Sequence, residues 1–208
     1  MRSTARVLLV AAAAANLGLG GPSFSSTWKA PDARPGTFQG KPVVAVLMSK
    51  DDGLRQGMEG LLAHELTQRG MKGIAAWSLI PTTEIRDEEK AKVRIRQSGA
   101  AGVVALRLVD RAQDASATNP MYFEAPAHGS SWSGYWSYGW GGLYDPGHVR
   151  VDNVFYVEAL VYSLEQNKLV WSGLSKTTNP KSAEDLVRRL VGKVADEVKK
   201  AGLVQKGS

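Results

Sequence analysis

The feature that most constrains the fold is a short, unbroken apolar run from Val43 to Met48, bounded by Pro42 and Ser49. Its length and its β-branched side chains are typical of a strand that is buried on both faces. Such strands occur where helices cover both sides of a parallel sheet. The run therefore predicts an α/β domain that begins near residue 42.

The residues after this run alternate between helical and extended patterns. Asp51 and Asp52 offer an N-cap, and an apolar stripe then leads to Gly70, which suits the left-handed residue that ends a helix. The stripe consists of Leu54, Met58, Leu61, Leu62 and Leu66. We expect a second strand over 74–80, a second helix over 84–98 and a third strand over 103–109. Strands that alternate with helices in this way predict right-handed crossovers and a parallel sheet.

The second half of the chain has a different pattern. Apolar and polar residues alternate over 149–164, which predicts a long half-buried strand, and the residues 165–168 form a tight connection to a returning strand over 169–176. The capping pattern at Ser182 and an apolar stripe up to Gly202 then predict a C-terminal helix. The expected fold is a single α/β domain over 42–204, with a mixed sheet in two or three layers: β-α-β-α-β, then an antiparallel β-hairpin and a C-terminal helix.

Residues 1–21 have the layout of a secretory signal peptide. Arg2 and Arg6 precede a nine-residue apolar stretch that is too short to span a membrane, and small residues follow it. Cleavage after Ala15 or after Gly20 fits the small-residue rule, and an uncleaved Ala-rich helix or an unstructured terminus is the alternative. The segment 22–41 is rich in Pro, Gly and Ser, which predicts a flexible tether. We therefore expect an exported protein, periplasmic or associated with the envelope.

Charge and cysteine content exclude several classes of protein. Loss of Arg2 and Arg6 leaves 24 basic and 20 acidic residues, a formal net charge of +4 in place of +6. The basic residues between 86 and 96 are interleaved with acidic ones, as on an ordinary solvated helix, so nucleic acid is not an expected partner. The chain has no Cys, which excludes disulfides, thiolate nucleophiles and iron–sulfur sites.

An insertion at about 111–148 separates the two halves of the domain, and its second part has an unusual composition. The segment 130–144 contains no Lys, Arg, Asp or Glu, and its aromatic residues stand among glycines: Trp132, Tyr135, Trp136, Tyr138, Trp140 and Tyr144. Exposed aromatic side chains on a loop can stack on sugars or pack against a partner protein. Two alternatives are that the loop covers a face or edge of the sheet, or that it contacts a lipid interface.

A second candidate site lies at the carboxyl ends of the expected parallel strands, where open sheets bind ligands. Lys50, Asp51 and Asp52 follow the first strand, and Asp110 follows the third. Carboxylates with a lysine can hold a small ligand or a metal ion with a phosphate group. The alternative is that Asp52 caps a helix and that Asp110 is only a polar residue at the end of a strand.

Motifs for catalysis and for cofactor binding do not stand out. His64, His128 and His148 lack the spacing of a zinc site, and neither phosphate-binding glycine loop is found in a strand-to-helix context. Gly129 to Gly134 resembles a nucleophile elbow only superficially. We therefore expect no enzyme activity, no cofactor and no metal, and we expect a binding or assembly module that acts through 130–144.

The mature chain resembles the small bacterial cell-envelope lipoproteins that are grouped under domains of unknown function. The resemblance rests on Trp28–Pro31 after the leader, Val43–Asp51, Gly99–Val109, and Lys168–Gly173 before the terminal helix. The resemblance implies an envelope protein with an envelope protein or a cell-wall glycan as its partner. Those lipoproteins carry a Cys after the leader for lipid attachment, whereas this chain has glycines there. A soluble periplasmic form, or anchoring by an uncleaved leader, is then expected in place of lipidation.

Overall fold

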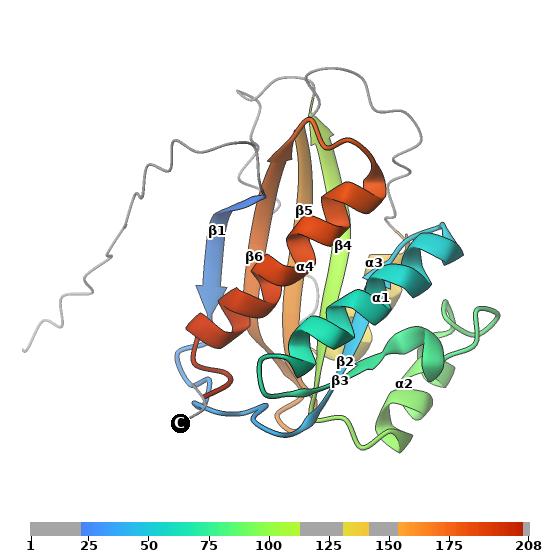
Figure 1. Ribbon diagram of the computed structural model, residues 1–208. Helices are drawn as coiled ribbons and strands as arrows, with labels where there is room; N and C mark the ends of the chain where they lie inside the picture. The colour runs from blue at the N-terminus through green and yellow to red at the C-terminus, as the bar shows by residue number, and fades with distance from the viewer. Residues whose placement is uncertain (1–21, 113–130, 142–153, 206–208) are drawn as a thin grey trace, which may run out of the picture.

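The computed structural model describes residues 22–112, 131–141 and 154–205. They form one mixed six-stranded sheet in the order β1-β6-β5-β4-β2-β3, with helices on both faces (Figure 1). The strands are β1 Ser23–Lys29, β2 Pro42–Met48, β3 Lys72–Ala75, β4 Gly102–Ala112, β5 Val154–Ser163 and β6 Lys168–Thr178. The helices are α1 Asp52–Thr67, α2 Glu88–Gln97, α3 Trp132–Gly141 and α4 Ala183–Lys200, with a 3-10 turn, η1, at Ala76–Ser78. The predicted α/β fold class is confirmed.

Strand β2 is buried on both faces, as its apolar run predicts. It pairs in parallel with β3 on one side and with β4 on the other. Val43, Ala45 and Leu47 pack in the core beneath α1 and α4, whereas the residues between them pack in a second core with side chains of α2 and α3. Because successive strand residues point to opposite faces, one strand supplies both cores. The domain therefore has three layers.

The C-terminal half has the predicted hairpin and helix, but β5 is buried on both faces and not half-buried as predicted. Residues 149–153 of the strand predicted over 149–164 lie outside the described residues. β4, β5 and β6 are antiparallel, and Asn167 at the turn between β5 and β6 has a φ of 48°. The hydroxyl of Ser182 accepts a hydrogen bond from the N–H of Asp185 at the start of α4. Gly202 after the helix has a φ of 73°, and the Leu203 side chain is fully buried. These contacts confirm the local signals that predict the helix and its two ends.

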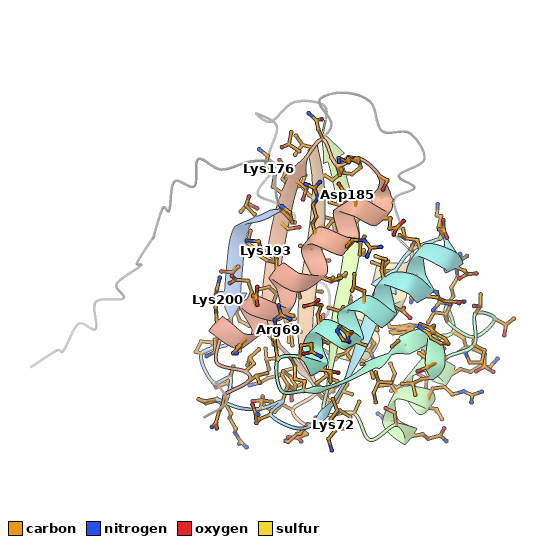
Figure 2. The ribbon with its side chains drawn as sticks, in the orientation of Figure 1. Arg69, Lys72, Lys176, Asp185, Lys193 and Lys200 are labelled. Atoms are coloured by element: carbon orange, nitrogen blue, oxygen red, sulfur yellow. The ribbon has the colours of Figure 1, made fainter. Side chains whose placement is uncertain are left out.

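A polar contact joins the two helices on this face of the sheet. Figure 2 shows Arg69, just after the end of α1, beside α4. Its Nε donates to Asp196 at 2.8 Å, and its guanidinium also pairs with Glu65 on α1. The arginine therefore links the exposed rims of two helices whose apolar sides share one core.

Two expected elements differ from the structure. The strand predicted over 74–80 is the shorter β3, Lys72–Ala75, so only Ile74 and Ala75 of the predicted range are extended, because η1 turns the chain before Ile80 enters the core. The second helix begins at Glu88 and not at Glu84, since the carboxylate of Asp87 accepts from the N–H of Lys90 and caps the helix there.

The predicted tether contains a strand. β1 pairs antiparallel with β6 and places the ring of Phe24 5.6 Å from that of Trp171, edge to face. Residues that follow β1 enter the core as well, since Phe38 has no exposed surface. The residues 22–41 have the composition of a linker. They are nevertheless ordered, because β1 pairs with β6. The prediction of a flexible tether was wrong for these residues.

The glycines of α1 give a prediction of stability. A Cβ at Gly57 or Gly60 would meet no atom within 4 Å, and neither residue has a positive φ. Glycine in a helix costs about 0.5–1 kcal/mol relative to alanine. We expect Gly57→Ala and Gly60→Ala each to raise the free energy of unfolding by that amount in urea titrations.

Gly73 in β3 is the matched control for these substitutions. A Cβ there would lie 2.0 Å from the carbonyl oxygen of Ala63, so the backbone of α1 would have to move. Gly73→Ala should lower the free energy of unfolding by about 1–3 kcal/mol. Equal effects at the three positions would contradict this packing of α1 against β3.

Candidate functional site

The aromatic segment forms the helix α3 rather than an exposed loop. Trp132, Tyr135, Trp136 and Trp140 are spaced as one face of a helix, and their exposed fractions are 3%, 2%, 1% and 9%. Glycine disfavours a helix, so burial of this aromatic face is what stabilises it. The expectation of a loop was wrong because the glycines mask a helical period of aromatic residues.

The buried rings attach α3 to two neighbouring elements. The ring of Tyr162 on β5 lies 5.6 Å from the rings of both Trp132 and Tyr135. Trp136 packs edge to face on Trp132 at 4.9 Å, and its indole N–H donates to the carbonyl of Ile85 at 3.1 Å. The helix is therefore fixed both to the sheet and to the segment before α2.

A buried ion pair lies beneath α3. Arg107 on β4 and Glu158 on β5 are direct cross-strand neighbours, and their side chains are only 7% and 12% exposed. The Nη2 and Nε of Arg107 donate to one oxygen of Glu158 at 3.0 and 3.3 Å. The hydroxyl of Tyr135 donates to the same oxygen at 3.2 Å, and the guanidinium lies 6.0 Å from the Tyr135 ring centroid. We call Arg107, Glu158 and Tyr135 the anchoring cluster.

Two tyrosines at this cluster have perturbed acidity. Burial, and then the negative charge of Glu158, raise the pKa of Tyr135 well above its ordinary value. The same two causes raise the pKa of Tyr162. Both phenols therefore keep their protons throughout the physiological range, and Tyr135 acts as a hydrogen-bond donor. The cluster holds α3 on the sheet through charge-assisted hydrogen bonds.

The predicted aromatic residues thus divide into two sets. Four of them are buried under α3, so the described part of the segment covers one face of the sheet. The side chain of Tyr138, and all of Tyr144, lie outside the described residues. Gly134 is exposed, so the side of α3 that carries it faces away from the sheet.

The residues predicted at the carboxyl ends of the strands have local contacts. Asp51 caps α1 by accepting from the N–H of Leu54 at 2.9 Å, and Asp52 accepts from Nε of Arg55 at 3.3 Å. Asp110 lies within β4 opposite Tyr156, and its side chain is outside the described part. The cap predicted for α1 is therefore formed by Asp51 and not by Asp52.

Asp51 also lines a groove between the first turns of α1 and α4. Its volume is about 450 Å³, and its walls are Asp51, Gly53, Leu54, Gly57, Met58, Ser182, Ala183 and Glu184. Exposed Lys50 directly precedes Asp51 in the chain. Within the described ranges, no group of three His, Cys, Asp or Glu residues could hold a metal ion. A small-ligand site at Lys50, Asp51, Asp52 and Asp110 stays a prediction.

Sequence reasoning missed a buried charged pair on α1. Arg55 and Glu59 have no exposed surface, although both are charged. Their position in the sequence was the available signal. Arg55 and Glu59 lie one helical turn apart, and each lies one turn before a buried apolar residue, Met58 and Leu62 respectively. Charged residues on an apolar stripe predict buried polar contacts, since an unpaired buried charge is costly.

Comparisons with known proteins give a weak similarity to two solved structures of one protein. No protein-family model and no curated protein matches the chain. Among solved structures, a PelC dodecamer from Paraburkholderia phytofirmans in space group P6 is similar, with 14% identity and a TM-score of 0.46. The match covers 89% of this chain and 99% of that one. A point variant of the same PelC, in space group C2, gives the same identity and score over 90% of this chain and all of that one.

The anchoring cluster gives a prediction of stability. Arg107→Met would leave Glu158 buried without its counter-ion, which should lower the free energy of unfolding by about 3 kcal/mol. Replacement of both charges, by Arg107→Met with Glu158→Met, should recover at least half of this loss, because no unpaired charge remains. Urea titrations of the two variants and the wild type measure the coupling. Additive losses would contradict a buried, directly paired cluster.

Proposed function

We propose that this protein is an exported cell-envelope protein that binds or assembles with a partner and does not catalyse a reaction. The observation that carries the proposal is the anchored aromatic helix. Four buried aromatic side chains and the anchoring cluster fix α3 on the sheet. The exposed side of α3 is then presented from a rigid support, which lowers the entropy cost of binding.

Export is supported by the sequence of the leader. Residues 1–21 combine two arginines, a short apolar stretch and small residues, which is the pattern of a secretory signal. In the part of the chain that the structure describes, no helix has the length and apolar character needed to cross a membrane. The proposal also draws on the resemblance to the small bacterial cell-envelope lipoproteins. In place of their lipid-anchored form, we propose a periplasmic form.

The proposed binding surface is the side of α3 away from the sheet. Positions 134 and 138 lie on the same side of the helix, opposite the buried aromatic residues at 136 and 140. The segment has no charged residue, and Tyr138 and Tyr144 are its two aromatic residues beyond the buried four. Aromatic rings stack on sugars and pack in protein interfaces, which suits a cell-wall glycan or an envelope protein.

The first test is the state of the protein after expression in a Gram-negative host. Intact mass of the periplasmic fraction should show a species shortened by 15 or 20 residues, depending on the cleavage site. Leu9→Arg, which places a charge in the apolar stretch, is the control and should remain full-length in the cytoplasm. A full-length cytoplasmic wild type would overturn export.

The second test addresses the binding surface. Tyr138→Ala with Tyr144→Ala should reduce co-sedimentation with purified peptidoglycan sacculi at least tenfold, with little change in melting temperature. Trp28→Ala is the matched control, because Trp28 is an exposed aromatic residue on β1, 38% accessible, outside the segment. It should sediment like the wild type.

A photo-cross-linker at position 138 distinguishes the partners in cells. Cross-linking to one envelope protein, without binding to sacculi, would assign a protein partner. Equal binding of the double variant, the control and the wild type, with no cross-link, would refute the surface.

A further inference from the structure

The two edges of the sheet differ in how their backbone groups are bonded. At the β3 edge, side chains occupy outward-facing groups of the strand. The N–H of Gly73 donates to the hydroxyl of Thr67 at 3.0 Å, and the carbonyl of Ala75 accepts from the hydroxyl of Ser78 at 2.7 Å. Contacts of this kind keep an edge strand from pairing with another chain. The β3 edge is therefore protected.

The edge at β1 is open. Figure 1 shows β1 as the last strand on its side of the sheet. The N–H of Ala30, directly after β1, donates to the carbonyl of Val170 at 3.0 Å. Because successive residues of a strand direct their backbone groups to opposite edges, those of Thr27 and Lys29 point away from β6. Both residues are exposed, and these outward groups have no hydrogen-bond partner within the described residues.

Lysines lie along this open edge. Lys29 is opposite Trp171, which packs in the core beneath α4, so both side chains leave from the same face of the sheet. Figure 2 shows Lys193 and Lys200 on the side of α4 toward β1, whereas the contacts with α1 lie on the other side of that helix. Lys200 pairs with Glu197 at 2.6 Å, but Lys29 and Lys193 form no ion pair in the described part of the chain. The edge is therefore basic.

We propose that the outer edge of β1 is a docking site for an extended acidic segment of a partner protein. The segment adds one strand to the six-stranded sheet and pairs with the outward backbone groups of Thr27 and Lys29. Neighbouring strands lie about 4.7–4.9 Å apart, which places its side chains on the α4 face beside Lys29 and the lysines of α4. Acidic side chains complement their charge.

The charge favours this partner over a second copy of the chain. Two copies joined through β1 would bring two basic edges together, and like charges opposite each other destabilise strand pairing. The protected β3 edge offers no alternative for head-to-tail pairing. The site involves no residue of α3, so it is separate from the binding surface proposed above.

Hydrogen exchange of the full chain, followed by NMR, tests the proposal with a defined probe. The probe is a synthetic peptide of alternating valine and glutamate with blocked ends. In the free protein, the N–H groups of Thr27 and Lys29 should exchange fast, and that of Trp28, which points to β6, should exchange slowly. Saturating peptide should slow the first two about tenfold and leave Trp28 unchanged. The same peptide with lysine in place of glutamate should give no protection.

Variants separate the backbone contribution from that of the charge. Thr27→Pro removes an outward N–H and no bond to β6, which edge strands tolerate, and should weaken peptide binding about tenfold. Thr27→Ala keeps the N–H and should bind like the wild type. Lys193→Gln should weaken binding about threefold, whereas Lys72→Gln, at the exposed lysine of β3, should have no effect. Tyr138→Ala with Tyr144→Ala should also bind the peptide normally, which distinguishes this site from α3.

Three results would overturn the proposal, and all come from the wild type, so none needs a variant to fold. The first is that saturating acidic peptide leaves the exchange of Thr27 and Lys29 unchanged. The second is equal affinity for the acidic and the basic peptide, which would show that the lysines select nothing. The third is protection of the same two amides without peptide, rising with protein concentration, which would assign the edge to a second copy.

Discussion

The two-sided burial of β2 is the constraint on which the rest of the structure depends. Residues Val43–Val46 have no exposed surface, and alternate residues of the strand enter different cores. A strand of this kind requires a cover on each face, since an open face would expose a continuous apolar surface to water. α1 and α4 provide one cover and α2 and α3 the other. The aromatic helix α3 is therefore needed first as part of the cover over one face of the sheet.

Prediction of the fold succeeded where a short stretch carries its own periodicity. Two elements show this: the apolar run Val43–Met48, and the apolar stripe of α4 that includes Leu190, Val194 and Val198. In both, the spacing of the apolar residues in the local sequence is enough to indicate which faces are buried. β1 has the opposite character. Its sequence, SFSSTWK, holds only two large apolar residues, and its extended form comes from hydrogen bonds with a partner that lies far away in the chain. No local pattern could indicate that partner.

Prediction of the conformation of the aromatic segment failed for a related reason. The aromatic residues of 130–144 were identified. Whether they form an exposed loop or a covering helix depends on whether the sheet offers them an apolar face. That face comes from Tyr162 and its neighbours on another strand. Arg55 and Glu59 are further examples. Two charged residues on a helix have the pattern of ordinary surface positions. Because β3 ends early, the backbone N–H groups of Leu47 and Trp77 are left to donate to Glu59, and these donors make its buried carboxylate favourable.

The pairing of β1 with β6 has a consequence for the order in which the molecule is completed. The hydroxyl of Ser25 bonds to the carbonyl of Leu174, a separation of 149 residues. A chain made from its N-terminus presents β1 well before β6 exists, so this edge of the sheet closes only near the end of synthesis. Contacts of such long range slow folding, because the closure entropy of a large loop precedes the gain from pairing. β1 therefore has no strand to pair with while the rest of the domain is still being made.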